Sequence, residues 1–232
     1  MKKTALYLLL AMFMVSGSLQ IATAEVPEIE SFKAGGISIN IPPPAGLIEV
    51  GYDVREQMEI FVNTTNRLLS AYMISDDIPR FVQGDKDLVL SRSACVQVLR
   101  QNEYQSYGTS DFNELVDYMK SSSNNDMASI TEETEAEFNR RMESMNLGKM
   151  SITTPIELGT LFSKPDAYSF GMISTSSDGS KSWTIVVSTT FVRVRDRIIL
   201  TYLTAEYKDD ETIATVRKTS EEWADAILAV NK

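Results

Sequence analysis

Residues 183–207 read WTIVVSTTFVRVRDRIILTYLTAEY, two runs rich in β-branched and aromatic side chains that meet at Arg195-Asp196. Such side chains fit the pleated, half-buried surface of a strand, and an Asp-containing dipeptide is common at turns. We therefore expect two strands, over 182–194 and 197–207, joined by a tight reversal. Strands joined by so short a connection lie antiparallel.

The rest of the chain adds strands on the same criteria. Lys164-Pro165-Asp166 and Ser177-Asp178-Gly179 are turn sequences that separate the two further C-terminal runs. Ile37, Ile39 and Ile41 alternate with polar residues before three prolines, which predicts a strand with a rigid exit. The remaining predicted strands cover 67–74, 88–101, 150–162 and 168–175, which gives about seven in all, and 75–87 is predicted to be a loop.

Four helices are predicted from capping residues and apolar periodicity. They begin near Asp53, Ser110, Thr131 and Asp209, and the last carries a long apolar stripe that includes Trp223. Helices interspersed with antiparallel hairpins predict an α+β fold, an antiparallel β-sheet flanked by helices as an α/β/α sandwich.

The N-terminus has the features of an export signal. Lys2 and Lys3 precede a short apolar run, and Ala22-Thr23-Ala24 matches a signal-peptidase site, so residues 1–24 are predicted to be a signal peptide cleaved between Ala24 and Glu25. An uncleaved anchor is the alternative. Residues 25–36 are expected to form a flexible arm, and 37–232 a single domain with a charged helical insertion near 126–146. The protein would then lie in a bacterial periplasm or be secreted.

Composition excludes several functions. The chain of 232 residues has no histidine, so a Ser-His-Asp site, a Cys-His site or a His-ligated metal cannot be built. Without residues 1–24, which hold two lysines and no acidic residue, 20 basic and 32 acidic side chains leave a net charge of −12. That charge is unfavourable for nucleic acid, and no later apolar run is long enough to span a membrane.

Asp76, Asp77, Asp85 and Asp87 offer the oxygen ligands that calcium prefers. Their spacing does not fit an EF-hand loop, and a solvated loop explains them more simply. The acidic cluster that starts at Asp209 is explained by helix capping and the helix dipole. No cofactor or metal is therefore predicted.

Arg193, Arg195 and Arg197 would share one face of a continuous strand and could hold an anion. Because they straddle the predicted hairpin end, exposed turn charges are the favoured interpretation. Trp183 and Trp223 are interpreted as core residues rather than an aromatic ligand cage. The single cysteine, Cys95, lies in an apolar-polar alternation typical of a buried strand residue rather than a reactive thiol.

The order of the elements resembles the PsbP-like α/β/α sandwich, whose namesake is an extrinsic subunit of photosystem II. The similarity is carried by Ile37 to Pro42, by the hairpin over 183–207 and by the closing helix with Trp223. The chain is also similar to an uncharacterised bacterial exported family with the same closing elements. The resemblance implies a non-enzymatic scaffold or accessory role and transfers no ligand residues.

These observations predict an exported, non-catalytic envelope protein that binds a protein partner or a small ligand. They single out no catalytic, cofactor-binding or metal-ligating residue. Two alternatives stay open. One is a histidine-independent hydrolase that uses paired carboxylates in the manner of a glycosidase. The other is a purely structural subunit of an envelope assembly.

Overall fold

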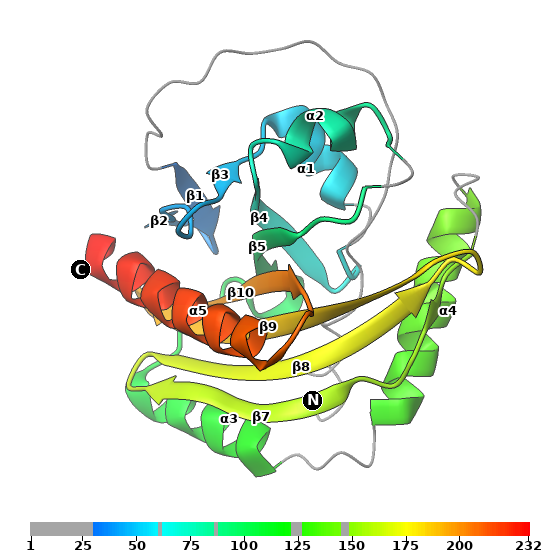
Figure 1. The fold of residues 1–232 in the computed structure, drawn as a ribbon. Helices are drawn as coiled ribbons and strands as arrows, with labels where there is room; N and C mark the ends of the chain where they lie inside the picture. Colours follow the sequence, from blue (N-terminus) through cyan, green and yellow to red (C-terminus); the bar gives the residue numbers. More distant parts are fainter. Residues whose placement is uncertain (1–29, 60–61, 86–87, 122–126, 145–148) are drawn as a thin grey trace.

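A computed structural model describes residues 30–59, 62–85, 88–121, 127–144 and 149–232 (Figure 1). In that part of the chain one antiparallel sheet has the order β3-β4-β5-β10-β9-β8-β6, and β7 also pairs with β8. Its strands are β3 (Ile48–Glu49), β4 (Asn66–Met73), β5 (Arg92–Leu99), β6 (Ser151–Ile152), β7 (Ile156–Lys164), β8 (Ala167–Ser177), β9 (Ser182–Val194) and β10 (Arg197–Glu206). A separate hairpin joins β1 (Ser31–Ala34) to β2 (Ile37–Asn40), and the helices are α1 (Tyr52–Glu59), α2 (Asp77–Val82), η1 (Arg100–Asn102), α3 (Thr109–Ser121), α4 (Met127–Ser144) and α5 (Asp210–Val230).

The hairpin of β9 and β10 forms the middle of the sheet, as the sequence predicts. Its two strands pair from Arg197 opposite Val194 to Glu206 opposite Ile185. Arg195 and Asp196 form the turn with φ values of 47° and 56°. A two-residue turn with both residues in the left-handed region matches the right-handed twist of its strands, which accounts for the tight reversal.

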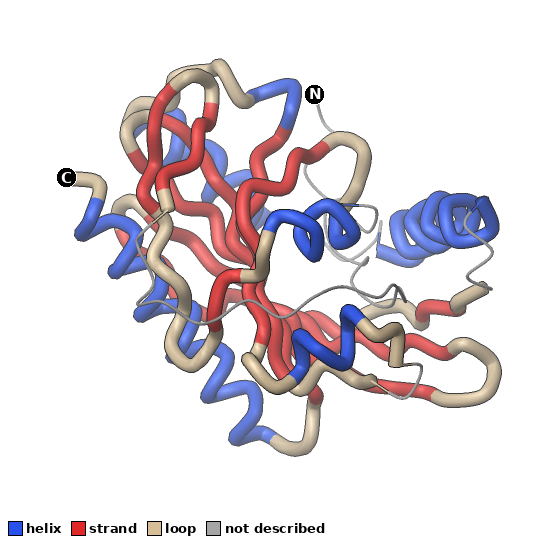
Figure 2. Tube along the Cα trace, turned by 90° about the horizontal axis from the view of Figure 1, so that it is seen from above, coloured by secondary structure: helices blue, strands red, loops and turns tan. Residues whose placement is uncertain are grey.

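One face of the sheet is covered by α5 and by the β1–β2 hairpin, as Figures 1 and 2 show for the long C-terminal helix. Asp209 caps α5 by accepting a hydrogen bond of 3.0 Å from the Thr212 backbone N–H. The buried stripe of α5 consists of Val216, Thr219, Ser220, Trp223, Ala224 and Ile227. This stripe closes the larger hydrophobic core against the sheet.

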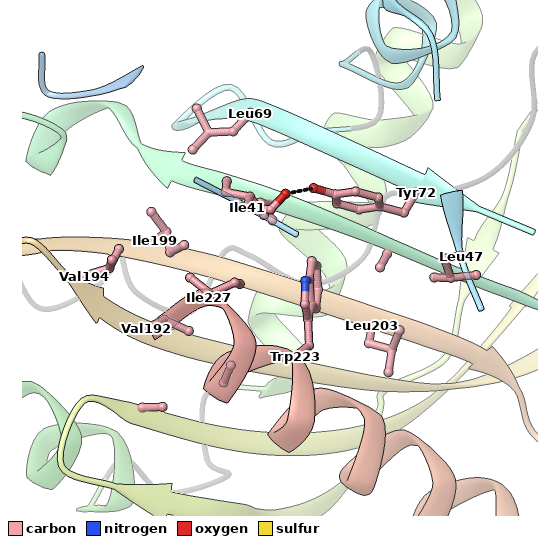
Figure 3. Packing of buried hydrophobic residues seen from close by; sticks show 14 of the residues in the cluster. Ile41, Leu47, Leu69, Tyr72, Val192, Val194, Ile199, Leu203, Trp223 and Ile227 are labelled. Carbon is pink, nitrogen blue, oxygen red and sulfur yellow. Dashed lines mark hydrogen bonds between the residues drawn. The ribbon is translucent and has the colours of Figure 1, made fainter. Parts of the chain in front are cut away.

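Trp223 connects α5 to the proline-rich exit of β2, and Figure 3 shows it on α5 near Tyr72 and Ile41. Its Nε1 donates a hydrogen bond of 2.7 Å to the Pro42 carbonyl, and its ring meets that of Tyr72 edge-on at 5.6 Å. The Tyr72 hydroxyl donates to the Ile41 carbonyl at 3.4 Å. The two aromatic residues thus hold the extended segment after β2 within the core.

The opposite face of the sheet carries α1, α2 and α3. Val54 and Met58 of α1, Phe81 of α2, and Phe112 and Val116 of α3 are buried in a second core. The two cores on opposite faces of one antiparallel sheet confirm the predicted α+β class, with helices flanking the sheet.

The predicted charged insertion forms α4, which begins at Met127 rather than Thr131 and packs against the end of the sheet (Figure 1). Asn139 donates to the Met150 carbonyl at 2.7 Å and accepts from the Met150 N–H at 2.8 Å. Phe138 and Met142 are buried with Met150, Ile152 and the partly buried Trp183. The apolar stripe of this helix is therefore packing surface.

Part of the predicted flexible arm over 25–36 is wrong. Residues 31–34 form β1, and Ala34 is buried in the larger core. The turn that joins β1 to β2 uses Gly35 and Gly36, with φ values of 54° and 79°. The paired glycines thus make a hairpin turn instead of ending an arm.

Three other boundaries differ from the predictions. The predicted loop over 75–87 contains the short helix α2, whose Phe81 is buried in the second core. The run 150–162 is divided into β6 and β7, because Pro155 lies between them and proline cannot continue a ladder of hydrogen bonds. The strand over 88–101 is limited to β5, which is followed by η1.

Residues 1–24, with the predicted cleavage between Ala24 and Glu25, lie outside the described residues, as do 25–29 of the predicted arm. Within the described ranges, no helix has both the length and the apolar composition that a membrane crossing requires.

Candidate functional site

An open groove of about 670 Å³ lies between β7 and α5. Its floor on the strand side is formed by Leu158, Thr160 and Leu161, and its wall on the helix side by Ile213 and Ala214. Leu161 is buried, Leu158 and Ile213 are partly buried against the same core, and Ala214 is exposed. The groove is therefore a continuation of the larger core that reaches the surface.

Two β-bulges in β7 create this floor. The pairing of β7 with β8 shifts register between Glu157 and Gly159 and again between Thr160 and Phe162. Leu158 and Leu161 are the residues left without a partner, and a bulge re-aims side chains in this way. Both leucines consequently join the core beneath α5, although three positions separate them in the chain.

The leucine nearer the core is accommodated by a glycine on the neighbouring strand. A Cβ atom placed on Gly171 of β8 would lie 2.9 Å from Cδ2 of Leu161. The missing side chain lets Leu161 lie directly over β8, and the groove remains open above it.

The outer edge of β7 pairs with no other strand among the described residues. An unpaired edge invites pairing with other chains, and bulges and charges are two features that discourage it. β7 has both, with two bulges and the exposed Glu157. Regular strand addition along β7 is thus disfavoured, and the groove offers side-chain contacts instead of a backbone ladder.

Most of the charges near the groove have partners. The Lys164 amine lies 3.1 Å from a Glu221 carboxylate oxygen and 2.7 Å from one of Asp225. Lys218 lies 3.9 Å from Glu222 in a highly exposed pair. Both interactions join residues near the solvent, where ion pairs contribute at most about 1 kcal/mol. They set the polar rim of the groove.

A second candidate site combines carboxyl groups and aromatic rings at the start of the described chain. Nη1 of Arg55 lies 3.9 Å from Glu30 and 3.8 Å from Glu49. The same guanidinium stands 5.6 Å from the ring centres of both Phe32 and Tyr52. The arginine thus joins the N-terminal hairpin to β3 and α1.

Glu49 is the group at this site whose pKa is shifted from its ordinary value. Its pKa is raised from 4.5 to about 7, first by burial and then by the neighbouring Glu30 carboxyl, against the opposing effect of Arg55. Oε1 of Glu49 is buried and has no hydrogen-bond partner among the described residues.

We expect this carboxyl pair to make folding stability depend on pH. Because the folded pKa of Glu49 exceeds the unfolded value, the native state binds the proton more tightly, and its stabilisation is complete below pH 4.5 and lost as the pH rises through 7. Allowing for solvent screening, the loss should be about 1–2 kcal/mol. Urea unfolding from pH 4.5 to 8 would measure it.

Glu49→Gln should remove most of this pH dependence, because glutamine carries no proton to lose. Glu114→Gln, on the exposed face of α3, is the control and should leave the dependence as it is. Glu30, Arg55 and the buried Tyr72 on β4 are the other titratable groups that act on Glu49 or are acted on by it. An unchanged slope in Glu49→Gln would show that Glu49 does not cause it.

The three arginines around the β9–β10 turn contact the protein. Nε of Arg193 donates to Asp166 at 2.9 Å, and Nη1 of Arg195 donates to the Ser38 carbonyl at 3.0 Å. Nη1 of Arg197 donates to the Gln105 carbonyl at 3.3 Å. These guanidinium groups join the turn to neighbouring segments, so they are neither an assembled anion site nor free turn charges.

The four aspartates considered for calcium are not gathered into a site. Asp77 opens α2 and is buried, whereas Asp85 pairs with Arg80 at 2.7 Å. Asp87 lies outside the described residues. Among the described residues, no group of three or more carboxylate or thiol side chains is placed to hold a metal ion.

Cys95 is a buried residue of β5, as predicted. Burial raises the pKa of its thiol to about 12, and the thiol accepts a hydrogen bond from Nε2 of Gln97 at 3.2 Å. Trp223 belongs to the main core as predicted, whereas Trp183 is partly buried in the small cluster under α4. Neither tryptophan lines the groove.

The sequence alone does not predict the groove. One signal was available, because Leu158-Gly159 interrupts the alternation of a strand, and glycine inside a strand often marks a bulge. β7 packs beside the face of α5 that adjoins the buried stripe, and this contact depends on tertiary packing. Neither feature follows from periodicity.

Comparisons with known proteins give little further guidance. No protein-family model matches the chain, and no curated protein matches it by sequence. A solved point mutant of the protein Mog1 is 13% identical, with a TM-score of 0.33 over 88% of this chain and 95% of that one. The Ran-binding protein Mog1p of Saccharomyces cerevisiae is 12% identical, with a TM-score of 0.31 over 87% and 93%.

Proposed function

We propose that this protein is a non-catalytic binding protein whose groove between β7 and α5 takes a segment of a protein partner. The observation that carries the proposal is a groove about 670 Å³ in volume, at which the partly buried side chains of Leu158 and Ile213 extend the larger core to the surface. Concave sites that combine apolar side chains with a few polar groups are the usual binding sites of proteins. The open shape suits a polypeptide segment better than a small molecule, which needs most of its surface buried.

The carboxylates that line the groove argue against the hydrolase alternative. Asp210 and Glu221 are 11 positions apart in α5. At 1.5 Å per residue they are separated by about 16 Å along the helix axis, whereas the two catalytic carboxyls of glycosidases lie about 5–9.5 Å apart. The two carboxylates that line the groove are therefore too far apart for that chemistry, and we propose a binding role without catalysis.

The proposal includes an exported location, in a periplasm or outside the cell. It rests on the basic, apolar and small-residue sequence of 1–24 and agrees with the non-enzymatic accessory role that the PsbP-like resemblance implies. Intact mass measurement of the protein from its own cells would test the location. A chain that begins at Glu25 supports export with cleavage, and a cell-internal chain that begins at Met1 overturns it.

Site-specific photo-cross-linking tests the groove. A benzophenone amino acid at Ala214 should form adducts with a protein in an extract of the cells that make it, because Ala214 is exposed within the groove. The same group at Thr215 is the matched control, since Thr215 is exposed on α5 but does not line the groove. The adduct should form from position 214 and be at least about tenfold weaker from 215.

Ala214→Trp, which fills the groove, should abolish adducts from a cross-linker placed at Thr160 on the floor of the groove, whereas Thr215→Trp should not. Equal adducts from positions 214 and 215 would count against the groove as the binding site. A bound molecule of a few hundred daltons, detected by native mass spectrometry and displaced by Ala214→Trp, would replace the protein segment with a small ligand.

A further inference from the structure

Arg217 differs from the other charged residues of the groove. It is exposed and lines the groove from α5, and no hydrogen bond or ion pair joins it to another residue in the part of the chain that the structure describes. By contrast Glu221 is held by Lys164 at 3.1 Å, and Lys218 lies 3.9 Å from Glu222. Asp210 lies in the first turn of α5, where the helix dipole stabilises a carboxylate. The groove therefore offers one guanidinium that is not already engaged.

Arg217 stands one helical turn from the apolar wall. It follows Ile213 by four positions, so the two side chains lie on one face of α5 and about 6 Å apart along its axis. Groove residues extend along α5 from Asp210 to Glu221, a distance of about 16 Å. An extended segment of about five residues covers that distance.

We propose, resting on the groove as the binding site, that its occupant is an extended segment with an apolar side chain and a carboxylate two residues apart. Side chains two residues apart in an extended chain face the same way and lie about 6.6 Å apart. That spacing places the apolar side chain against Leu158 and Ile213 and the carboxylate beside Arg217. Arginine binds carboxylates in a bidentate manner, with charge-assisted hydrogen bonds.

The net negative charge of the protein limits how acidic this occupant can be. A net charge of −10 for the whole chain repels strongly anionic partners such as nucleic acid. A segment with a single carboxylate beside an apolar residue meets Arg217, the exposed Lys218 and an apolar floor. The groove thus selects a short pattern, apolar-x-Asp or apolar-x-Glu in either direction, and not a general acidic surface.

Selection from a random dodecapeptide library displayed on phage tests this proposal without knowledge of the natural partner. Peptides are selected on the purified protein and counter-selected on Ala214→Trp, so that only groove-dependent peptides remain. We expect these peptides to be enriched in an acidic residue two positions from Leu, Ile, Val or Phe. Arg217→Gln should weaken their binding about five- to tenfold, and Arg217→Lys should have an intermediate effect.

Lys208→Gln is the matched control, because it removes one exposed positive charge outside the groove. It should change peptide affinity less than twofold. Groove-dependent peptides without the acidic residue, or with affinity unaffected by Arg217→Gln, would overturn the carboxylate proposal and leave the groove intact. If no selected peptide is sensitive to Ala214→Trp, the groove proposal itself fails.

Discussion

Trp223→Ala should lower the free energy of unfolding by about 3–5 kcal/mol, the range for truncation of a fully buried large aromatic side chain. Trp223 is only 2% exposed and lies where α5, the sheet and the segment after β2 meet. Its removal leaves a cavity beside Tyr72, and the Pro42 carbonyl loses the hydrogen bond that it accepts from Nε1 of Trp223. A domain of this size has a total stability of about 5–15 kcal/mol, so the variant should be close to unfolding.

Urea unfolding followed by circular dichroism would measure the effect. Trp223→Phe separates its causes, because phenylalanine refills much of the cavity but donates no hydrogen bond, and it should cost about 1–3 kcal/mol. Trp183→Ala is the comparison at the other tryptophan. Since Trp183 is partly buried in a small cluster, its truncation should cost less than that of Trp223. A loss below 1 kcal/mol in Trp223→Ala would show that the aromatic contact does not hold the core together.

Local signals in the sequence account for the elements that were predicted correctly. The β9–β10 hairpin follows from alternation and a two-residue turn, and α5 follows from a capping aspartate and an apolar period. The α+β class follows from their order. These features depend on residues close together in the chain, so one sequence is enough to identify them.

The parts that were missed depend on contacts between distant segments. β1 is a strand of four residues whose pairing requires the turn at Gly35, and α2 has only six residues. The groove needs two bulges in β7 and the position of α5 across the sheet. The Glu30–Glu49–Arg55 site joins three elements, and none of these residues belongs to a motif. Bulges and contacts between distant segments produce no strong local pattern in the sequence.

Gly35→Ala should be the most damaging substitution at a glycine of the N-terminal hairpin. Gly35 has a φ of 54°, and a Cβ atom there would lie 2.0 Å from the Glu103 carbonyl oxygen and 2.8 Å from Nε of Arg197. Since the nearer atom belongs to the backbone, the hairpin or the segment after β5 must move. The contact also includes a 3.2 Å hydrogen bond from the Gly35 N–H to the Glu103 carboxylate, which Arg67 binds as well.

Gly36→Ala provides a matched control for this steric effect. Gly36 has a φ of 79°, but a Cβ atom there meets no other atom within 4 Å. Both substitutions place alanine in the left-handed region, which costs about 1 kcal/mol. Only Gly35→Ala adds the clash, so its unfolding free energy should fall by about 2–4 kcal/mol in total. Urea unfolding of the two variants would measure the difference, and equal losses would mean that the β1–β2 turn does not pack against Glu103.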